Sequence, residues 1–455
     1  MCELNRFILA IIAALVLFLS AVCAPVYSSV GYEGSINPYL IYFRGPKLNK
    51  QLINEISKYD FVVFDRFRYH EVNKDTWSAI YLRNKGLKIF LYQLGPVVRG
   101  DTDHFDTYYL NNIGRYKKSR NHKSGDIFNN NNEWFLRNNY GFRYELGGDN
   151  YFLMDFGNPK FQMYWIESTL SDLVNRPWAA NGVMVDLCVP FSIKTAGGLR
   201  GKYSKKYPDS KTWDVAMNSF IDSASARLKD ANQMIMVNTG YSNTKSGFNA
   251  WKSLDNKNNP PDIALEEGAF AVAYGKNDVR FYPEEQWRRQ VDLANNIHNY
   301  SVAYMSHTDL SPDETGVDSL GEKINFNQVF NFALGSYLLA KNDSGKKSYF
   351  SIDYARKIKG SYKNMYFSPV YEQLAFGQAI DGYKKESNVA IYSREFEKGI
   401  VYVNPSNTIQ SIKDFKSKQY MFLDIDFIKG IKVKFNNAST IDIKPHSALF
   451  LQKVN

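Results

Sequence analysis

The stretch Gly182-Val-Met-Val-Asp-Leu187 decides the fold class of this 455-residue chain. It is a short β-branched run that ends on a carboxylate. A segment with helical periodicity precedes it over residues 158–174, and another follows over residues 213–230. A strand between two helices is the repeating unit of a parallel sheet with helical crossovers, so the stretch predicts an α/β fold.

The same alternation extends in both directions from this strand, between residues 38 and 352. Strands are predicted at 38–43, 60–65, 87–94, 182–187, 234–239, 262–267, 301–306 and 349–352. Eight strands spread over about 320 residues favour a closed (βα)8 TIM barrel over an open sheet. The sequence has no GxGxxG after the first strand and no P-loop, so nucleotide-binding open sheets lose their main support.

The pattern changes after about residue 382, where short strands follow one another without helices. We predict strands at 388–392, 399–403, 420–424, 430–435, 440–443 and 448–452. This spacing is typical of an antiparallel β-sandwich. The predicted organisation is a signal peptide or signal anchor over residues 1–24, a TIM barrel over 33–381 and a β-sandwich over 382–455.

The N-terminal segment and the net charge indicate the cellular location of the protein and limit its classes of partner. Residues 7–22 form an uncharged run that is typical of a secretory signal, so we expect a secreted, periplasmic or cell-surface protein. An uncleaved segment would tether the chain to a membrane. The net charge of +10 is spread along the chain, which argues against a nucleic-acid partner. We expect a monomer without metal or cofactor, since the sequence has no CxxC or Cys/His cluster.

Polar residues at the ends of the predicted strands mark the candidate site, because TIM-barrel active sites lie at the carboxyl ends of the strands. These strand ends carry Asp65 and Arg66, Gln93, Asp186, Asn238, Glu266 and Glu267, His307 and Asp309, and Asp353.

Asp186 is the sharpest of these signals. Alternation along its strand places Val183 and Val185 toward the helices, and Met184 and Asp186 toward the barrel interior. A carboxylate in that position is costly unless it is paired or used, so we predict a catalytic role.

The sixth strand supplies a second carboxylate. Alternation there places Ile263 and Leu265 outward and Ala264 and Glu266 inward, which favours Glu266, although Glu267 could also lean over the mouth. Glycoside hydrolysis needs one carboxylic acid and one carboxylate acting as nucleophile or base. Asp186 with Glu266 or Glu267 would supply that pair.

Further side chains are candidates for binding the hydroxyl groups of a sugar. They are Asp65, Tyr92, Gln93, Asp155, Asn238, Tyr241 and His307. Asp155 precedes Asn158-Pro159, which opens a helix, so a capping or anchoring role is equally consistent with its position. His307 and Asp309 could be metal ligands, but no further His lies near the other strand ends, and an ordinary polar loop is favoured. The basic, Tyr-rich insertion over residues 99–149 could form one wall of the cleft, but a solvated loop is slightly favoured.

Several motifs resemble a known family. They are Tyr151-Phe-Leu-Met-Asp155-Phe-Gly-Asn158-Pro159 with Tyr164-Trp165, Gly182-Val-Met-Val-Asp186, Asp262-Ile-Ala-Leu-Glu-Glu267-Gly268, and the C-terminal Arg394-Glu-Phe-Glu-Lys-Gly399-Ile-Val-Tyr-Val-Asn404-Pro405 and Pro445-His-Ser-Ala448. The chain resembles the hypothetical glycosyl hydrolases, TIM barrels that are similar to the endo-α-1,4-polygalactosaminidases. The resemblance implies working carboxylates at Asp186 and at a Glu before a glycine, which points to Glu267.

These observations lead to one expected function with two alternatives. We expect an exported glycoside hydrolase that cleaves a polysaccharide with two carboxylates. A non-catalytic carbohydrate-binding barrel would keep the aromatic cleft without needing facing carboxylates. A metal-dependent polysaccharide deacetylase would need a His/Asp triad, which the sequence does not display.

Overall fold

The computed structural model describes residues 36–42, 47–65, 73–99, 132–137, 141–146, 151–174, 180–189, 204, 206–273, 278–342, 346–354, 366–413, 419–435 and 439–454. The predicted signal segment, Arg66 and most of the 99–149 insertion lie outside these residues. Within them, no helix is both long enough and apolar enough to cross a membrane.

Eight parallel strands form the predicted barrel. In spatial and chain order they are β1 (Tyr39–Tyr42), β2 (Phe61–Phe64), β3 (Lys88–Leu94), β7 (Gly182–Asp186), β8 (Met234–Asn238), β9 (Ile263–Glu267), β12 (Ser301–Thr308) and β15 (Ser348–Tyr354). A parallel bridge between Pro38 and Phe350, with Phe350 N–H donating to Asn37 O, joins the first strand to the last. This contact closes the sheet and confirms the TIM-barrel prediction.

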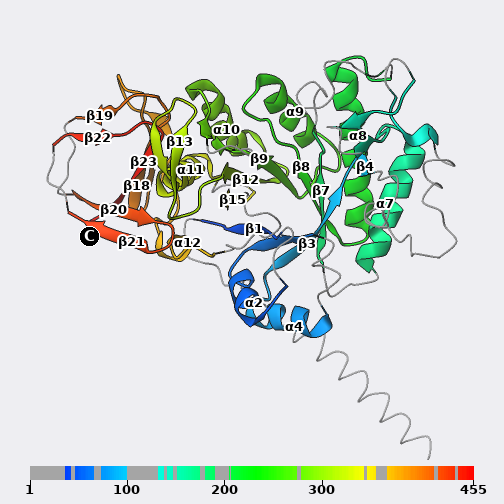
Figure 1. Cartoon of the computed structure of the whole chain (residues 1–455), viewed down its shortest axis with the longest axis horizontal. Coiled ribbons are helices and arrows are strands. Elements are labelled where there is room, and N and C mark those ends of the chain that lie inside the picture. The colour runs from blue at the N-terminus through cyan, green and yellow to red at the C-terminus, as the bar shows by residue number, and fades with distance from the viewer. Residues whose placement is uncertain are drawn as a thin grey trace, which may run out of the picture.

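Helices cover the outside of the barrel (Figure 1). They are α2 (Lys50–Ile56), α4 (Lys74–Arg83), α7 (Pro159–Val174), α8 (Ser210–Asp230), α9 (Lys245–Asp255), α10 (Glu284–Asn296), α11 (Phe326–Ala340) and the short α12 (Val370–Gln373). Helix α9 was not predicted from the sequence, because it contains a Gly, two Ser and an Asn, which disfavour helix interiors. Tertiary packing stabilises α9, since its own residues Trp251 and Leu254 are buried.

The barrel strands bury side chains on both faces. Eleven buried residues fill the interior: Tyr39, Phe61, Val63, Phe90, Met184, Met236, Ile263, Leu265, Ala303, Met305 and Tyr349. The opposite faces of the same strands, with Val62, Ile89, Val183 and Ala264 among them, join the larger cluster beneath the helices. This partition shows which strand residues point to the axis and therefore which polar residues reach the mouth.

Two small sheets are formed by loops of the barrel. The strands β4 (Val97–Arg99), β6 (Tyr151–Leu153) and β5 (Glu145–Leu146) follow barrel strand β3. The strands β10 (Ala271–Val272), β11 (Asp278–Phe281), β13 (Thr315–Asp318) and β14 (Lys323–Asn325) follow β9 and β12. Both sheets extend loops that leave the carboxyl ends of barrel strands.

The C-terminal part forms the predicted antiparallel unit. A six-stranded sheet runs in the order β16 (Lys384–Lys385), β17 (Tyr392–Phe396), β18 (Gly399–Asn404), β23 (Ser447–Lys453), β20 (Tyr420–Asp426) and β21 (Gly430–Lys434). A two-stranded sheet of β19 (Gln410–Ile412) and β22 (Ile441–Ile443) packs on it through Ile441 and Ile443, against Tyr402 and Leu449. The domain boundary at residue 382 stays a prediction.

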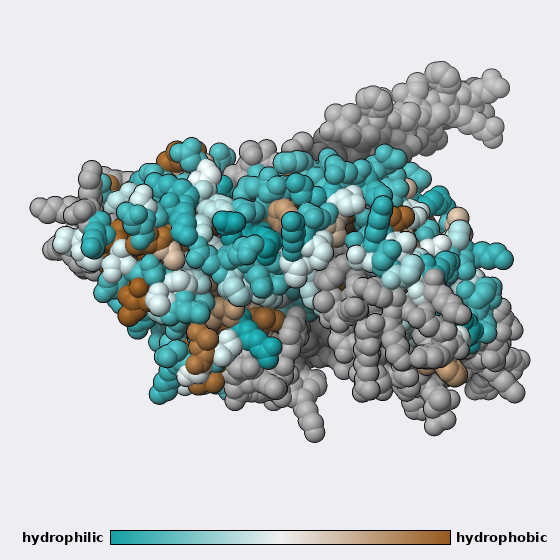
Figure 2. All heavy atoms as spheres, turned by 90° about the horizontal axis from the view of Figure 1, so that it is seen from above, coloured by the Kyte–Doolittle hydropathy of each residue, from teal (hydrophilic) through white to brown (hydrophobic). Residues whose placement is uncertain are grey.

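The other face of this sheet packs on α11, on one side of the barrel (Figure 1). Helix α11 buries twelve of its fifteen residues. At Gly335 a Cβ atom would lie 2.5 Å from Ala448 Cβ and 3.0 Å from Val403 Cγ2, so glycine permits the close approach of helix and sheet. The face seen in Figure 2 is mostly hydrophilic, with scattered hydrophobic side chains, most of them toward the C-terminal sheet.

We predict that Gly335→Val destabilises the whole protein rather than the C-terminal sheet alone. The added side chain would collide with Ala448 and Val403, and such overpacking costs about 1–3 kcal/mol of unfolding free energy. Urea denaturation followed by both fluorescence and circular dichroism checks this. Ser219→Val on the exposed face of α8 is the matched control, expected within roughly 0.5 kcal/mol of the parent. Equal stability of the two variants would contradict the packing argument.

Candidate active site

One layer of polar side chains crowns the barrel interior. At the carboxyl ends of seven strands, one further inward-facing residue lies above the hydrophobic interior, because side chains two positions apart on a strand point the same way. This layer comprises Asp65, Tyr92, Asp186, Asn238, Glu267, His307 and Asp353. Six of these residues form a continuous series of side-chain contacts from β3 round to β15, so the barrel brings together side chains that are up to 261 positions apart.

Asp186 is held by three hydrogen-bond donors. The Tyr92 hydroxyl donates to Oδ2. The Leu187 backbone N–H and the Asn238 amide donate to Oδ1, at 2.7 and 2.8 Å. Burial raises the pKa of Asp186, the neighbouring charge of Glu267 raises it further, and the three donors oppose both effects.

Glu267 lies next to Asp186 and shares a donor with it. The Asn238 Nδ2 atom lies 2.8 Å from Asp186 Oδ1 and 2.6 Å from Glu267 Oε2. One amide group therefore bridges two carboxyl groups. The side chain of Glu267 is 29% exposed, which leaves it open to a ligand.

His307 continues the series on the other side of Glu267. Its imidazole is fully buried, with Nε2 3.3 Å from Glu267 Oε1 and Nδ1 3.1 Å from Asp353 Oδ2. The register of the sheet explains this proximity, because His307 pairs with Asp353 across β12 and β15. Below them, Tyr39 of β1 faces Glu267 and Asp353, and its pKa is raised by burial and by both of these charges.

Glu266 is placed outside the mouth, which corrects the predicted alternation of this strand. Ile263 and Leu265 point into the barrel, so Glu267 points inward and Glu266 points to the helix layer. Both carboxylate oxygens of Glu266 accept from Ser242 N–H at 3.1 Å, and Gln290 Nε2 donates to Oε1 at 3.0 Å. The predicted parity was wrong because a parallel strand buried on both faces carries no polar alternation.

The backbone is strained where three barrel strands end. Leu187, Tyr241 and Phe270 adopt φ values of 61°, 61° and 62°, in the left-handed region that non-glycine residues rarely visit. They follow β7, β8 and β9, the strands of Asp186, Asn238 and Glu267. Strain of this kind persists only where the surrounding structure imposes it, and it concentrates at functional sites.

A cavity of about 340 Å³ opens beside Glu267. Its walls come from the segments after β7, β8 and β9, including Leu187, Asn238, Tyr241, Arg280 and Tyr282. Arg280 and Tyr282 were not predicted from the sequence, because β10 and β11 are too short to show a periodic pattern. Tyr241 was predicted, and its pKa is raised by burial and by the charges of Glu267 and Glu266.

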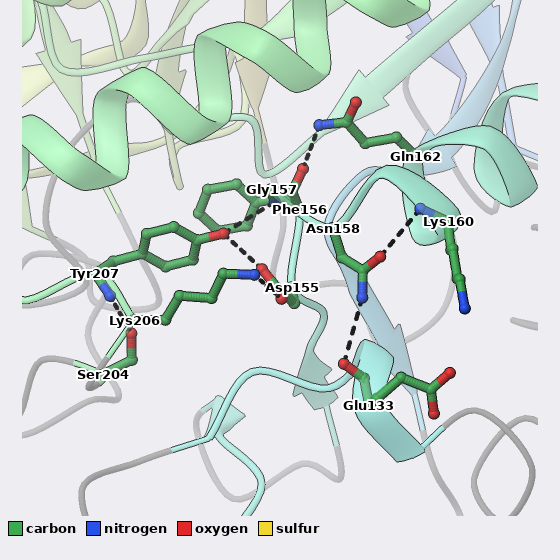
Figure 3. Close-up of polar contacts among 10 residues, drawn as sticks. All are labelled: Glu133, Asp155, Phe156, Gly157, Asn158, Lys160, Gln162, Ser204, Lys206 and Tyr207. Atoms are coloured by element: carbon green, nitrogen blue, oxygen red, sulfur yellow. Dashed lines mark hydrogen bonds and ion pairs between the residues drawn. The ribbon is translucent and has the colours of Figure 1, made fainter.

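Two predicted sugar-binding residues lie elsewhere. Gln93 faces the helix layer, where its Nε2 donates to Thr169 of α7 at 2.9 Å. Asp155 accepts from Lys206 Nζ and from the Tyr207 hydroxyl, both at 2.5 Å, and Tyr207 in turn accepts from Gly157 N–H (Figure 3). Asp155 is 5% exposed and fits the anchoring alternative, tying residues 155–157 to the segment before α8.

The remaining strand-end residues are also placed. Asp65 follows β2 and is buried, two positions beyond Val63, which lies in the interior cluster. Asp309 is buried two positions beyond His307. Among the described residues, no group of three or more His, Cys, Asp or Glu side chains is arranged to hold a metal ion.

We predict that Glu266→Gln changes how stability depends on pH. Burial raises the pKa of Glu266 from 4.5 to about 7. A raised folded-state pKa gives stability that is complete below pH 4.5 and is lost as the pH rises through 7. Unfolding free energies measured at pH 5 and pH 8 should therefore fall by roughly 2–3 kcal/mol more in the parent than in Glu266→Gln. Parallel pH profiles would contradict the assignment.

Comparisons with solved structures give several barrels of low identity. An Anoxybacillus α-amylase is 9% identical with a TM-score of 0.48, covering 93% of this chain and 98% of its own. A GH27 β-L-arabinopyranosidase from Geobacillus stearothermophilus is 8% identical with a TM-score of 0.47, covering 94% and 98%. A maltogenic α-amylase from Thermotoga neapolitana is 11% identical with a TM-score of 0.45, covering 92% and 99%. No curated protein sequence matches this chain.

The family comparison confirms the resemblance seen in the motifs. Residues 102–400 match the family described as hypothetical glycosyl hydrolase family 15. This segment contains the strands that carry Asp186, Asn238, Glu267, His307 and Asp353. The narrower likeness to polygalactosaminidases stays a prediction. Since the match spans more than half of the chain, the protein belongs to hypothetical glycosyl hydrolase family 15.

Proposed function

We propose that this glycoside hydrolase cleaves a polysaccharide with Asp186 and Glu267 as its two working carboxyl groups, with retention of anomeric configuration. The observation that carries the proposal is the bridge formed by Asn238, whose amide nitrogen contacts both groups at the mouth of the barrel. Glu266 has no place in this chemistry, since its carboxylate points to α10.

The separation of the carboxyl groups supports retention. Because Asp186 Oδ1 and Glu267 Oε2 contact the same nitrogen, they lie no more than about 5.4 Å apart, as in retaining glycosidases. Inverting enzymes separate their carboxyl groups by roughly 6.5–9.5 Å to admit a water molecule.

The surrounding donors suggest a role for each group. Two carboxyl groups this close favour a state in which one of them keeps a proton. The Tyr92 hydroxyl, the Leu187 N–H and the Asn238 amide all stabilise an ionised Asp186. Burial and the charge of Glu267 raise the pKa of Asp186, and these three donors oppose the rise. Because Glu267 shares only the Asn238 donor of these three, we place the proton on Glu267, which lines the cavity. We assign Asp186 as the nucleophile and Glu267 as the general acid and base.

The reaction follows from this assignment. Asp186 attacks the anomeric carbon while the glycosidic C–O bond breaks, and Glu267 gives its proton to the departing oxygen. The ionised Glu267 then takes a proton from a water molecule. That water attacks the same carbon and releases Asp186, which restores both groups. Tyr241, Tyr282 and Arg280 lie on the cavity wall, where they would contact the sugar.

The setting is also part of the proposal. The uncharged run at residues 7–22 supports export to the periplasm, the cell surface or the medium, with a membrane tether if the segment is retained. We propose that the enzyme works there as a monomer on a polysaccharide and without a cofactor.

We predict that Glu267→Gln lowers kcat by about 10²–10⁴-fold, the contribution of one general acid or base, and that Asp186→Asn, which removes the nucleophile, lowers it at least as much. Reducing-end release from a panel of polysaccharides measures this. Glu266→Gln is the matched control, and it should keep most of its activity at pH 6, where Glu266 itself is largely protonated. Loss in Glu266→Gln with activity retained in Glu267→Gln would reverse the assignment.

The products distinguish the alternatives. Azide should rescue Asp186→Gly with an inverted glycosyl azide and Glu267→Gly with a retained one, and proton NMR of the first product from the parent should show retention. An inverted first product would overturn the retaining mechanism. Glycan binding without reducing ends in any variant would instead indicate a carbohydrate-binding barrel, and release of acetate alone would indicate a deacetylase.

A further inference from the structure

His307 lies between two carboxyl groups and is sealed from solvent. It is 0% exposed, whereas Glu267 and Asp353 retain side-chain exposures of 29% and 15%. Nδ1 forms a hydrogen bond with Asp353 Oδ2 at 3.1 Å. Nε2 lies 3.3 Å from Glu267 Oε1, a close approach that does not have the geometry of a hydrogen bond in this structure. The imidazole is therefore placed to act on a substrate through Glu267 rather than by direct contact.

The ring nitrogen of His307 that carries the hydrogen determines whether Glu267 faces a hydrogen-bond donor or an acceptor. In a neutral imidazole one nitrogen donates and the other accepts. An ionised Asp353 accepts only, so it selects the tautomer with hydrogen on Nδ1 and leaves Nε2 as an acceptor. A protonated Glu267 Oε1 can then donate to Nε2, which stabilises the neutral acid. The opposite tautomer would donate to Glu267 and stabilise its carboxylate.

We infer that His307 and Asp353 are positioning residues that hold the catalytic proton on Glu267 in the resting enzyme. Asp353 fixes the tautomer of His307, and His307 Nε2 accepts from Glu267 until a glycosidic oxygen takes the proton. The O–H bond of Glu267 then breaks as that of the departing hydroxyl forms. This inference rests on the proposed role of Glu267.

Other titratable groups also surround Glu267 and influence its pKa. Asp186 faces it from β7, Tyr39 from β1 and Tyr241 from the segment after β8, and Glu266 adjoins it on β9. Arg280 contributes a positive charge to the cavity wall. His307→Gln leaves the charges of these groups in place, whereas Asp353→Asn also removes one of the charges that raise the pKa of Tyr39. Agreement between the two variants therefore isolates the effect of the pair.

The first test is the pH dependence of kcat/KM in Asp353→Asn and His307→Gln. An asparagine at 353 can donate to Nδ1 and so select the tautomer with hydrogen on Nε2, and a glutamine at 307 can present an amide donor to Glu267. Both changes should move the basic limb of the profile to lower pH by about one unit. His298→Gln, at an exposed surface position, is the control and should leave the limb in place. Reduced kcat with an unmoved limb in both variants would overturn the inference and leave a purely structural role.

The second test does not require a substrate. Nitrogen-15 NMR of histidine-labelled protein reports which ring nitrogen of His307 carries hydrogen, with the signal assigned by its loss in His307→Gln. We expect hydrogen on Nδ1 in the parent and on Nε2 in Asp353→Asn. Hydrogen on Nε2 in the parent at neutral pH would overturn the inference. This outcome is separable from failure of the proposed function, which would appear as an absence of hydrolysis while the expected tautomer is present.

Discussion

The rest of the site depends on one electrostatic constraint, the placement of two carboxyl groups within reach of a single amide nitrogen. If both groups were ionised at that distance and partly removed from water, they would repel each other strongly. Neutral hydrogen-bond donors, such as the Asn238 amide that contacts both groups, offset this repulsion. Tyr92 and the Leu187 N–H stabilise Asp186 on one side. On the other side, His307 Nε2 lies 3.3 Å from Glu267 Oε1. The asymmetry between these neighbours is what makes two similar carboxyl groups chemically different.

The barrel supplies this asymmetry through its register. The strand β12 pairs His307 with Asp353 of β15, and it pairs Met305, two positions earlier, with Glu267 of β9. This register places His307 next to both carboxyl groups. Beneath that layer, eleven buried hydrophobic residues fill the interior, and their close packing supports the polar groups above them. The strained residues Leu187, Tyr241 and Phe270 then turn the chain away sharply, and the cavity opens beside them. The strand register and the packed interior thus fix the positions of the polar side chains at the mouth.

Sequence patterns predicted the eight barrel strands and the antiparallel C-terminal strands, because β-branched runs and turn residues are local signals. They predicted Asp186 correctly as inward-facing, since Met184 and Asp186 share a face. They misplaced Glu266, because Ile263 and Leu265 are as suitable for the barrel interior as for its outside. The sequence did not indicate the partners of Gln93 and Asp155, because Thr169 and Lys206 lie 76 and 51 positions away and no local pattern reports such contacts. It therefore left sugar binding and anchoring equally open for Asp155.

The place of the last strand in the C-terminal sheet has a consequence for how the chain is made. Strand β23 ends the described chain, yet it lies in the middle of the six-stranded sheet, between β18 and β20, and it packs against α11. A polypeptide that emerges from the ribosome in order exposes the apolar flank of α11 until residues 447–453 appear. Helix α11 therefore gains its full cover only after residues 447–453 have been made, and a chain cut short before residue 447 would leave part of this apolar helix exposed.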